Sequence, residues 1–195
     1  LPNLSFISLL EYQLNNQIYD HVEEINNRLE TVQALNERIE YAIKTTGQQP
    51  NDLMDQRDQS ILELSKYIDV KQYESVNGTM DIYSASGKIP LVSGNTITRI
   101  EAAPSEYPAD NRVELYIRIG DERREISSLV QGGQLGGILD YRTNMLDQAQ
   151  NDLGLTLNGM VASMNWQHYQ GYDLNGNAGE EFFQPLLARA TESIN

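Results

Sequence analysis

Residues 51–58, with the sequence Asn-Asp-Leu-Met-Asp-Gln-Arg-Asp, predict the start of an amphipathic helix. The side-chain oxygen of Asn51 suits an N-terminal cap, and Asp52 and Asp55 suit the positive end of the helix dipole. The following positions recur every three or four residues, which is the spacing of one helical face over about residues 51–68: Leu53, Arg57, Ile61, Leu64 and Ile68. Because an unpaired charge on an apolar face is costly, we expect Arg57 to hold this helix against a carboxylate or carbonyl of a neighbouring helix.

A heptad repeat precedes this helix, over about residues 3–44. Four seam residues are spaced seven apart: Ile18, Ile25, Val32 and Ile39. A second set follows each by four residues and includes Asn36, a polar residue that can fix the register of a helical seam. The pattern predicts a long helix that ends near Gly47 and Pro50. The short loop that follows predicts two antiparallel helices.

Residues 69–128 carry strand and turn signals instead. Asn77-Gly78 separates two short runs and is typical of a β-hairpin turn. Further turns separate short apolar or alternating runs, of which residues 112–119 are the longest. These signals predict a small antiparallel β unit.

A second heptad pattern predicts a helix over about residues 134–169. Its seam residues are Leu139, Leu146, Leu153 and Met160, and Arg142 lies among the residues that fill the seam. Four glycines mark the start of the helix and are expected to permit a tight turn and a close helix approach: Gly132, Gly133, Gly136 and Gly137. Gly171 is expected to cap its end.

Together these patterns predict a predominantly helical α+β fold, an elongated bundle of long antiparallel helices with a small antiparallel β unit inserted between them. We expect four parts: 1–68, the long helix and the second helix of the rod-like bundle; 69–128, the β unit; 129–170, the helix that completes the bundle; and 171–195, a turn-rich segment leading to an outer part. The chain begins at Leu1, inside a helical pattern, and we expect it to be a fragment.

Composition restricts the possible partners. The chain has 28 acidic and 14 basic side chains, a formal net charge of −14. Nucleic acids and anionic membranes attract basic surfaces, so neither is an expected partner. Cysteine is absent, which excludes disulfides and cysteine-based zinc sites. No apolar run approaches the ~20 residues that a membrane-spanning helix needs.

Four patterns resemble functional sites, but each is better explained by structure. Four carboxylates can be considered as acid–base pairs, namely Asp52, Asp55, Asp58 and Glu63, yet no neighbouring nucleophile is evident, and a solvated acidic face is favoured. The glycines of 132–137 resemble a phosphate-binding loop, but the Lys and Ser/Thr of that motif are missing. The two histidines, His21 and His168, lack partners at metal-ligand spacing. We therefore expect no catalysis and no cofactor.

The segment 173–177 is the fourth pattern. Asp173, Asn175 and Gly176 begin like a calcium-binding EF-hand loop, but position six is Ala178 and position twelve is Gln184, where that loop requires Gly and Glu. A turn with Asn-Gly chemistry is favoured over a metal site.

Three segments, taken in order, resemble the bacterial flagellar hook-associated protein 1 family. The first is 50–58 with its continuation to residue 64, which is similar to the family signature NDLLDQRD. The second is 132–153, which begins Gly-Gly-Gln-Leu-Gly-Gly. The third is 165–183, in which Gly171, Asp173, Asn175 and Gly176, then Phe182 and Phe183, match the family's GYDLNGN and FF motif.

The resemblance implies a structural subunit without enzymatic activity. Members of the family stack helical domains along the flagellar axis and form the junction between hook and filament. The implied partners are copies of the chain itself, the hook protein, and other hook-associated or filament subunits. The implied location is the extracellular flagellum, reached by export without a cleaved signal peptide. The terminal segments of the family are not recognisable here.

A second class of function stays open on periodicity alone. A coiled-coil adaptor or binding module of an intracellular assembly would use the same seams to bind a partner helix. The three motifs favour the flagellar subunit, and a parent gene that extends on both sides with amphipathic terminal helices would separate it from the adaptor.

Overall fold

The computed structural model describes residues 2–84, 87–106 and 112–184, and of residues 2–5 it describes the backbone only. These residues form two compact units, of which the first ends at Arg142 and the second begins at Thr143. Each unit is described separately. The mainly helical α+β class with an antiparallel β unit between helices is confirmed.

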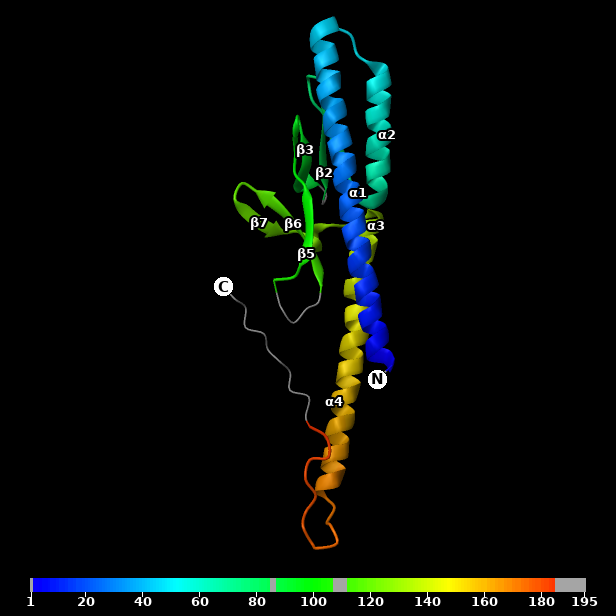
Figure 1. The fold of residues 1–195 in the computed structure, drawn as a ribbon, viewed down its shortest axis with the longest axis vertical. Helices are drawn as coiled ribbons and strands as arrows, with labels where there is room; N and C mark the ends of the chain where they lie inside the picture. Colours follow the sequence, from blue (N-terminus) through cyan, green and yellow to red (C-terminus); the bar gives the residue numbers. More distant parts are fainter. Residues whose placement is uncertain (1, 85–86, 107–111, 185–195) are drawn as a thin grey trace. The chain divides into compact units, whose positions relative to one another are not determined.

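Three helices form the framework of the first unit. Helix α1 (Pro2–Thr46) and helix α2 (Asn51–Tyr67) run antiparallel, and α3 (Gly133–Tyr141) contacts both. Figure 1 shows the strands on the side of α1 that faces away from α2. Gly47 closes α1, since its φ is +68° and its N–H donates to Ile43 O at 2.9 Å.

The strands between α2 and α3 form two antiparallel sheets. The first sheet has the order β1-β2-β3-β4, with the strands Lys71–Glu74, Met80–Ser84, Ile89–Ser93 and Thr96–Ile97. The second has the order β5-β6-β7, with the strands Ile100–Pro104, Val113–Ile119 and Glu122–Glu125. Helix α1 contacts β3, β4 and β5, so both sheets lie against the same helix.

One apolar core joins these layers. It combines the α1 seam with α2, the inner faces of both sheets and α3, and it includes Ile25, Ile61, Leu91, Leu115 and Leu135. Strand β6 is unusual because all of its first five residues are buried, so the alternating pattern of the sequence does not leave one face in water there. The core therefore depends on the sheets as much as on helix–helix contact.

The predicted cap of α2 is wrong. Asn51 is the first residue of the helix, and Pro50 precedes it without any side-chain cap. The N–H groups of Leu53 and Met54 donate instead to the carbonyl of Pro50, at 3.0 and 3.1 Å. Proline supplies a fixed φ at this point, and its carbonyl serves as the acceptor that a capping side chain would otherwise provide.

The second unit contains helix α4 (Asp147–Tyr169) and the segment after it. A π-helical segment, Arg142–Leu146, separates α3 from α4, so the predicted continuous helix of about 134–169 is interrupted. No helix among the described residues is both long and apolar enough to cross a bilayer.

Candidate functional site

Arg57 is a buried structural arginine. It is only 1% exposed, and its Nη1 donates to the carbonyl of Gly78 at 2.7 Å. Its Nε also lies 3.5 Å from the Asp58 carboxylate, which is exposed. The acceptor belongs to the turn between β1 and β2, so our expectation of a partner on a neighbouring helix was wrong.

Gly78 permits this contact because of its backbone conformation. Its φ is +82°, in the left-handed region that glycine adopts without strain. A Cβ at this position would lie 2.5 Å from Ile43 Cδ1, so the turn is pressed against α1. The hairpin tip therefore touches α1 while its carbonyl reaches the arginine of α2.

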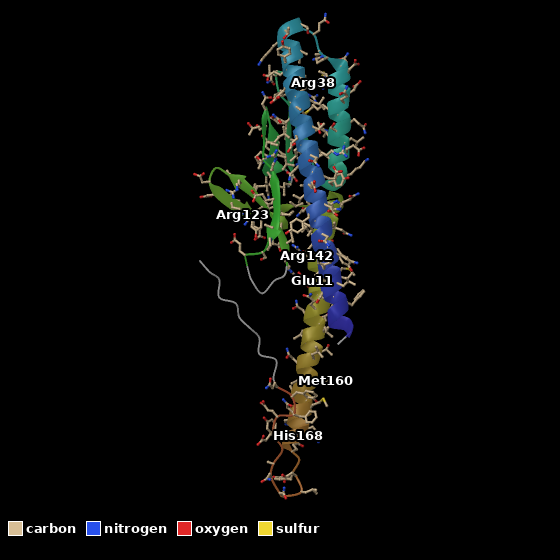
Figure 2. All side chains as sticks on the ribbon, viewed as in Figure 1. Glu11, Arg38, Arg123, Arg142, Met160 and His168 are labelled. Atoms are coloured by element: carbon tan, nitrogen blue, oxygen red, sulfur yellow. The ribbon has the colours of Figure 1, made fainter. Side chains whose placement is uncertain are left out.

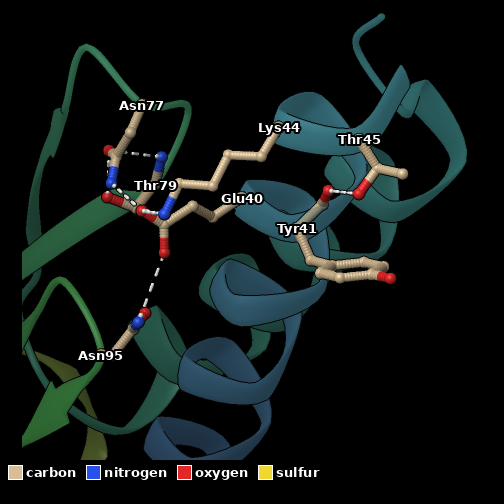
Figure 3. Close-up of polar contacts among 7 residues, drawn as sticks. All are labelled: Glu40, Tyr41, Lys44, Thr45, Asn77, Thr79 and Asn95. Carbon is tan, nitrogen blue, oxygen red and sulfur yellow. Dashed lines mark hydrogen bonds and ion pairs between the residues drawn. The ribbon is translucent and has the colours of Figure 1, made fainter. Parts of the chain in front are cut away.

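A polar cluster ties the same end of α1 to two turns of the first sheet (Figure 3). The Glu40 carboxylate accepts from Lys44 Nζ and Asn77 Nδ2, both at 2.9 Å, and from Asn95 Nδ2 at 3.3 Å. These hydrogen bonds, that of Lys44 first, lower the pKa of the Glu40 carboxyl from its ordinary 4.5 to about 2. The charged form is the one that holds α1 to the sheet.

This cluster predicts an acid-sensitive contribution to stability. Because the folded pKa is depressed, the contribution is present above about pH 4.5 and is lost as the pH falls towards 2. Glu40→Gln should therefore lower the free energy of unfolding at pH 6 but make little difference at pH 2. Denaturant titrations of both proteins across this range measure the difference.

Asn95→Ala is the second variant for that test. It removes one donor, so its difference from the parent should have the same sign and a smaller size. A Glu40→Gln difference that is equal at pH 6 and pH 2 would contradict this account of the cluster.

Asparagine amides of α1 pair with strand backbones. Asn36 is fully buried, donates to Met80 O and accepts from Met80 N–H, both at 2.9 Å. Asn26 makes the same pair of bonds with Ile100, and Asn15 accepts from Val113 N–H. The polar seam residue Asn36 thus fixes α1 against a strand rather than against another helix.

Arg142 is the second buried arginine, at the end of the first unit (Figure 2). Its Nη1 donates to Val113 O at 2.6 Å and its Nη2 to the Glu114 carboxylate at 2.9 Å. Glu114 is itself buried, so the ion pair neutralises two buried charges at the start of β6.

Two of the four glycines at the start of α3 lie against other backbone. A Cβ on Gly133 would lie 2.5 Å from Ile68 N, and one on Gly136 would lie 2.7 Å from Gln131 C. Gly132 has a φ of +72° and approaches Asp69, whereas Gly137 faces open space. No Lys or Ser/Thr of a phosphate-binding motif stands in 132–137. The backbone of this segment therefore passes close to the backbone at the end of α2.

In the second unit, the segment 171–183 folds back on the end of α4. Asn165 donates through Nδ2 to Phe183 O at 2.7 Å, and its Oδ1 accepts from the N–H groups of Phe182 and Phe183. His168, which Figure 2 labels near the end of α4, has its Nδ1 2.6 Å from Glu180 O. We call this arrangement, residues 165–183, the α4 end loop.

The turn of the α4 end loop uses Asp173 as an internal acceptor. One carboxylate oxygen accepts from the N–H groups of Asn175 and Asn177, and the other accepts from Asn177 Nδ2. These bonds lower the pKa of the Asp173 carboxyl, mainly through Asn177. Gly176 has a φ of +86°, and Gly171 N–H donates to His168 O. Both carboxylate oxygens are thus already engaged by the loop itself.

The remaining candidate residues lie at the surface or line the seams. Asp52, Asp55 and Asp58 are all exposed. The first seam is buried throughout, at Ile18, Ile25, Val32 and Ile39. The second seam changes along its length: Leu139 and Leu146 are buried, Leu153 is half-buried and Met160 is 57% exposed. Within the described residues, no three acidic, histidine or cysteine side chains group as a metal site.

A comparison with protein families matches nearly all of the residues described above. Residues 5–183 match the model described as the flagellar hook-associated protein FlgK helical domain. The chain belongs to this family. The matched range includes the Arg57 contact, the glycine crossing and the α4 end loop.

Relatives from several bacteria agree with the family match. The chain is 36% identical over 186 residues to flagellar hook-associated protein 1 of Escherichia coli K12, covering 93% of this chain and 34% of that protein. It is 27% identical over 197 residues to flagellar hook-associated protein 1 of Bacillus subtilis 168, covering 90% and 38%. The chain thus spans about a third of the length of these relatives.

A solved structure supports the fold. The flagellar hook junction protein FlgK from Burkholderia pseudomallei superposes with a TM-score of 0.79 at 29% sequence identity. The match covers 91% of this chain and 32% of that chain. The relatives are flagellar proteins by name, and none of these names describes an enzyme.

Sequence reasoning missed the residues that lock the family's motifs in place. Asn165 and His168 lie at the start of the third segment and hold the backbone that follows, but no residue spacing assigned them that role. Asn26 and Asn15 were missed on α1, although half-buried asparagines beside an apolar seam are a usable signal for backbone pairing.

Proposed function

We propose that this chain is the helical domain of a structural subunit at the junction between flagellar hook and filament. The observation that carries the proposal is the family match over residues 5–183, which includes all three motifs. The proposed location is the extracellular flagellum. The proposed partners are copies of the chain, the hook protein, and other hook-associated or filament subunits.

The internal contacts support a structural role without catalysis. The two buried arginines and the Glu40 cluster each join elements that are far apart in sequence. Their polar groups are used in holding those elements together, and this leaves them poorly suited to bind a substrate. Such contacts within the first unit suit a subunit that packs between two tubular assemblies.

The intracellular adaptor is the weaker alternative. Its mechanism requires the heptad seam of α1 to be available to a partner helix. In this chain the four seam residues from Ile18 to Ile39 are fully buried, and the first three belong to the core shared with α2, α3 and the sheets. A partner helix would have to displace that core.

Deletion of the parent gene tests the proposal. Cells without the protein should keep their hooks, lose their filaments and fail to swim, and the full-length gene should restore swimming. Normal filaments and swimming after deletion would refute the proposal.

A further inference from the structure

The α4 end loop and the last turns of α4 border an open cavity of about 940 Å³. Its apolar walls come from Met164 on the helix and from Tyr172 and Phe182 on the loop. Asp173 and Glu180 stand among its polar lining residues. The cavity lies entirely within the second unit.

The cavity belongs to an ordered framework. Asn165 fixes the backbone at Phe182 and Phe183, and His168 fixes it at Glu180. Gly179 N–H donates to Gly171 O, and a Cβ on Gly179 would collide with His168 O. The two phenylalanine rings meet edge to face, with centroids 4.9 Å apart. The backbone of the loop is therefore held against α4 without any occupant.

Large apolar side chains remain in water around this cavity. Tyr172 and Phe182, which line the cavity, are 76% and 62% exposed, and Met164 on the helix is 40% exposed. Exposed apolar side chains that line a hollow are typical of a protein-binding surface.

The surrounding charge has one sign. Residues 143–184 contain no lysine or arginine, and their acidic residues are Asp147, Asp152, Asp173, Glu180 and Glu181. A partner with positive charge beside its apolar residues is therefore favoured. A second copy of this chain fits poorly, because its net charge is −14 and the exposed arginines of β6 and β7 already pair with Glu101 and Glu122.

A small polar ligand or a metal ion fits less well. The buried polar atoms that lack a partner among the described residues are Tyr116 Oη and Arg142 Nε, and both belong to the first unit. The Asp173 oxygens accept hydrogen bonds within their own turn. The cavity thus offers shape and apolar contact to an occupant rather than unsatisfied polar groups.

We propose that this cavity is a docking site for an apolar segment flanked by Lys or Arg on a different, neighbouring protein. The proposal rests on the proposed function, because it gives the chemistry of one axial neighbour. The apolar residues of that segment enter between Met164 and Phe182, and its basic residues face Asp173 and Glu180.

Two synthetic peptides test the docking site on the 195-residue chain. One is an amphipathic helix with leucine on one face and lysine on the other, and the second has glutamate in place of every lysine. Fluorescence anisotropy of the labelled peptides measures binding. The lysine peptide should bind at least about tenfold more tightly than the glutamate peptide, and its affinity should fall as salt is added.

Matched variants separate docking in the cavity from general attraction to an acidic protein. Met164→Ala removes a cavity wall and Glu180→Gln removes a rim charge, and each should weaken binding by roughly three- to tenfold. Met160 lies one helical turn before Met164, and Asp152 is an acidic residue outside the lining. The variants Met160→Ala and Asp152→Asn should therefore bind the lysine peptide as the parent does. Circular dichroism checks that all four keep their helix content.

Three outcomes would overturn the docking site. These are no binding of the lysine peptide, equal weakening by all four variants, and self-association of the chain that Met164→Ala abolishes, which would make a second copy the occupant. Gene deletion tests the proposed function separately. Loss of filaments together with absent peptide binding would reject only the docking site.

Discussion

Replacing Arg57 with alanine is expected to lower the free energy of unfolding by roughly 3–5 kcal/mol. The guanidinium is almost completely buried, so the substitution leaves a cavity and also leaves the Gly78 carbonyl without its donor. Arg57→Lys should retain part of the stability, because an ammonium can donate to the carbonyl but does not fill the volume of the planar fork. Urea denaturation followed by circular dichroism measures both variants.

Arg99→Ala is the matched control for this prediction. Arg99 is 61% exposed and pairs with Glu30 at the surface, so its loss should change stability by less than about 1 kcal/mol. If Arg57→Ala and Arg99→Ala unfold at the same urea concentration, Arg57 does not hold the hairpin to α2.

Gly133→Ala should be comparably destabilising, by roughly 3–5 kcal/mol. The residue has a φ of +62°, and the added Cβ would overlap the backbone where Tyr67 joins Ile68. Backbone atoms at the end of a packed helix cannot rotate away as a flexible side chain would. The substitution must therefore shift α3 away from α2, within the core of the first unit.

Gly137→Ala provides the control in the same helix. No atom lies within 4 Å of the position that a Cβ would take at Gly137. Alanine also stabilises a helix by about 1 kcal/mol relative to glycine. The variant should therefore be as stable as the parent or slightly more stable. Equal unfolding midpoints for Gly133→Ala and Gly137→Ala would show that the close crossing does not constrain the fold.

The helices and the hairpin could be predicted because their signals are local. The heptad from Ile18 to Ile39 depends on positions along one helix, and Asn77-Gly78 is a turn signal of two adjacent residues, although the observed turn is longer and closes from Ser75 to Gly78. The elements observed there are α1 and the β1–β2 hairpin. The same periodicity identified which face of α1 is buried but carried no information about the element that covers it.

The partners could not be predicted because they depend on the tertiary structure. Arg57 was expected to meet a helix, yet its acceptor is a hairpin carbonyl 21 residues further along the chain. Asn36 was assigned to a helical seam but pairs with a strand. Both side chains can donate a hydrogen bond to any well-placed carbonyl, so their residue type does not specify the partner.

The α4 end loop shows the same limit at the candidate site. The motif residues Asp173 and Gly176 predicted a turn, and a turn is present. The fold-back of Phe182 and Phe183 onto Asn165 could not be predicted, because one side-chain amide satisfies two backbone N–H groups across a gap of 17 and 18 residues. The packing of α4 along α1 remains a prediction, since the two belong to separate units.

The position of the full-length protein on the flagellum tests the central claim most directly. Gold-labelled antibody raised against this chain, viewed by electron microscopy on intact flagella, reports that position. The proposed function predicts label confined to the boundary between hook and filament. Label along the whole filament, or label only inside the cell, would contradict it.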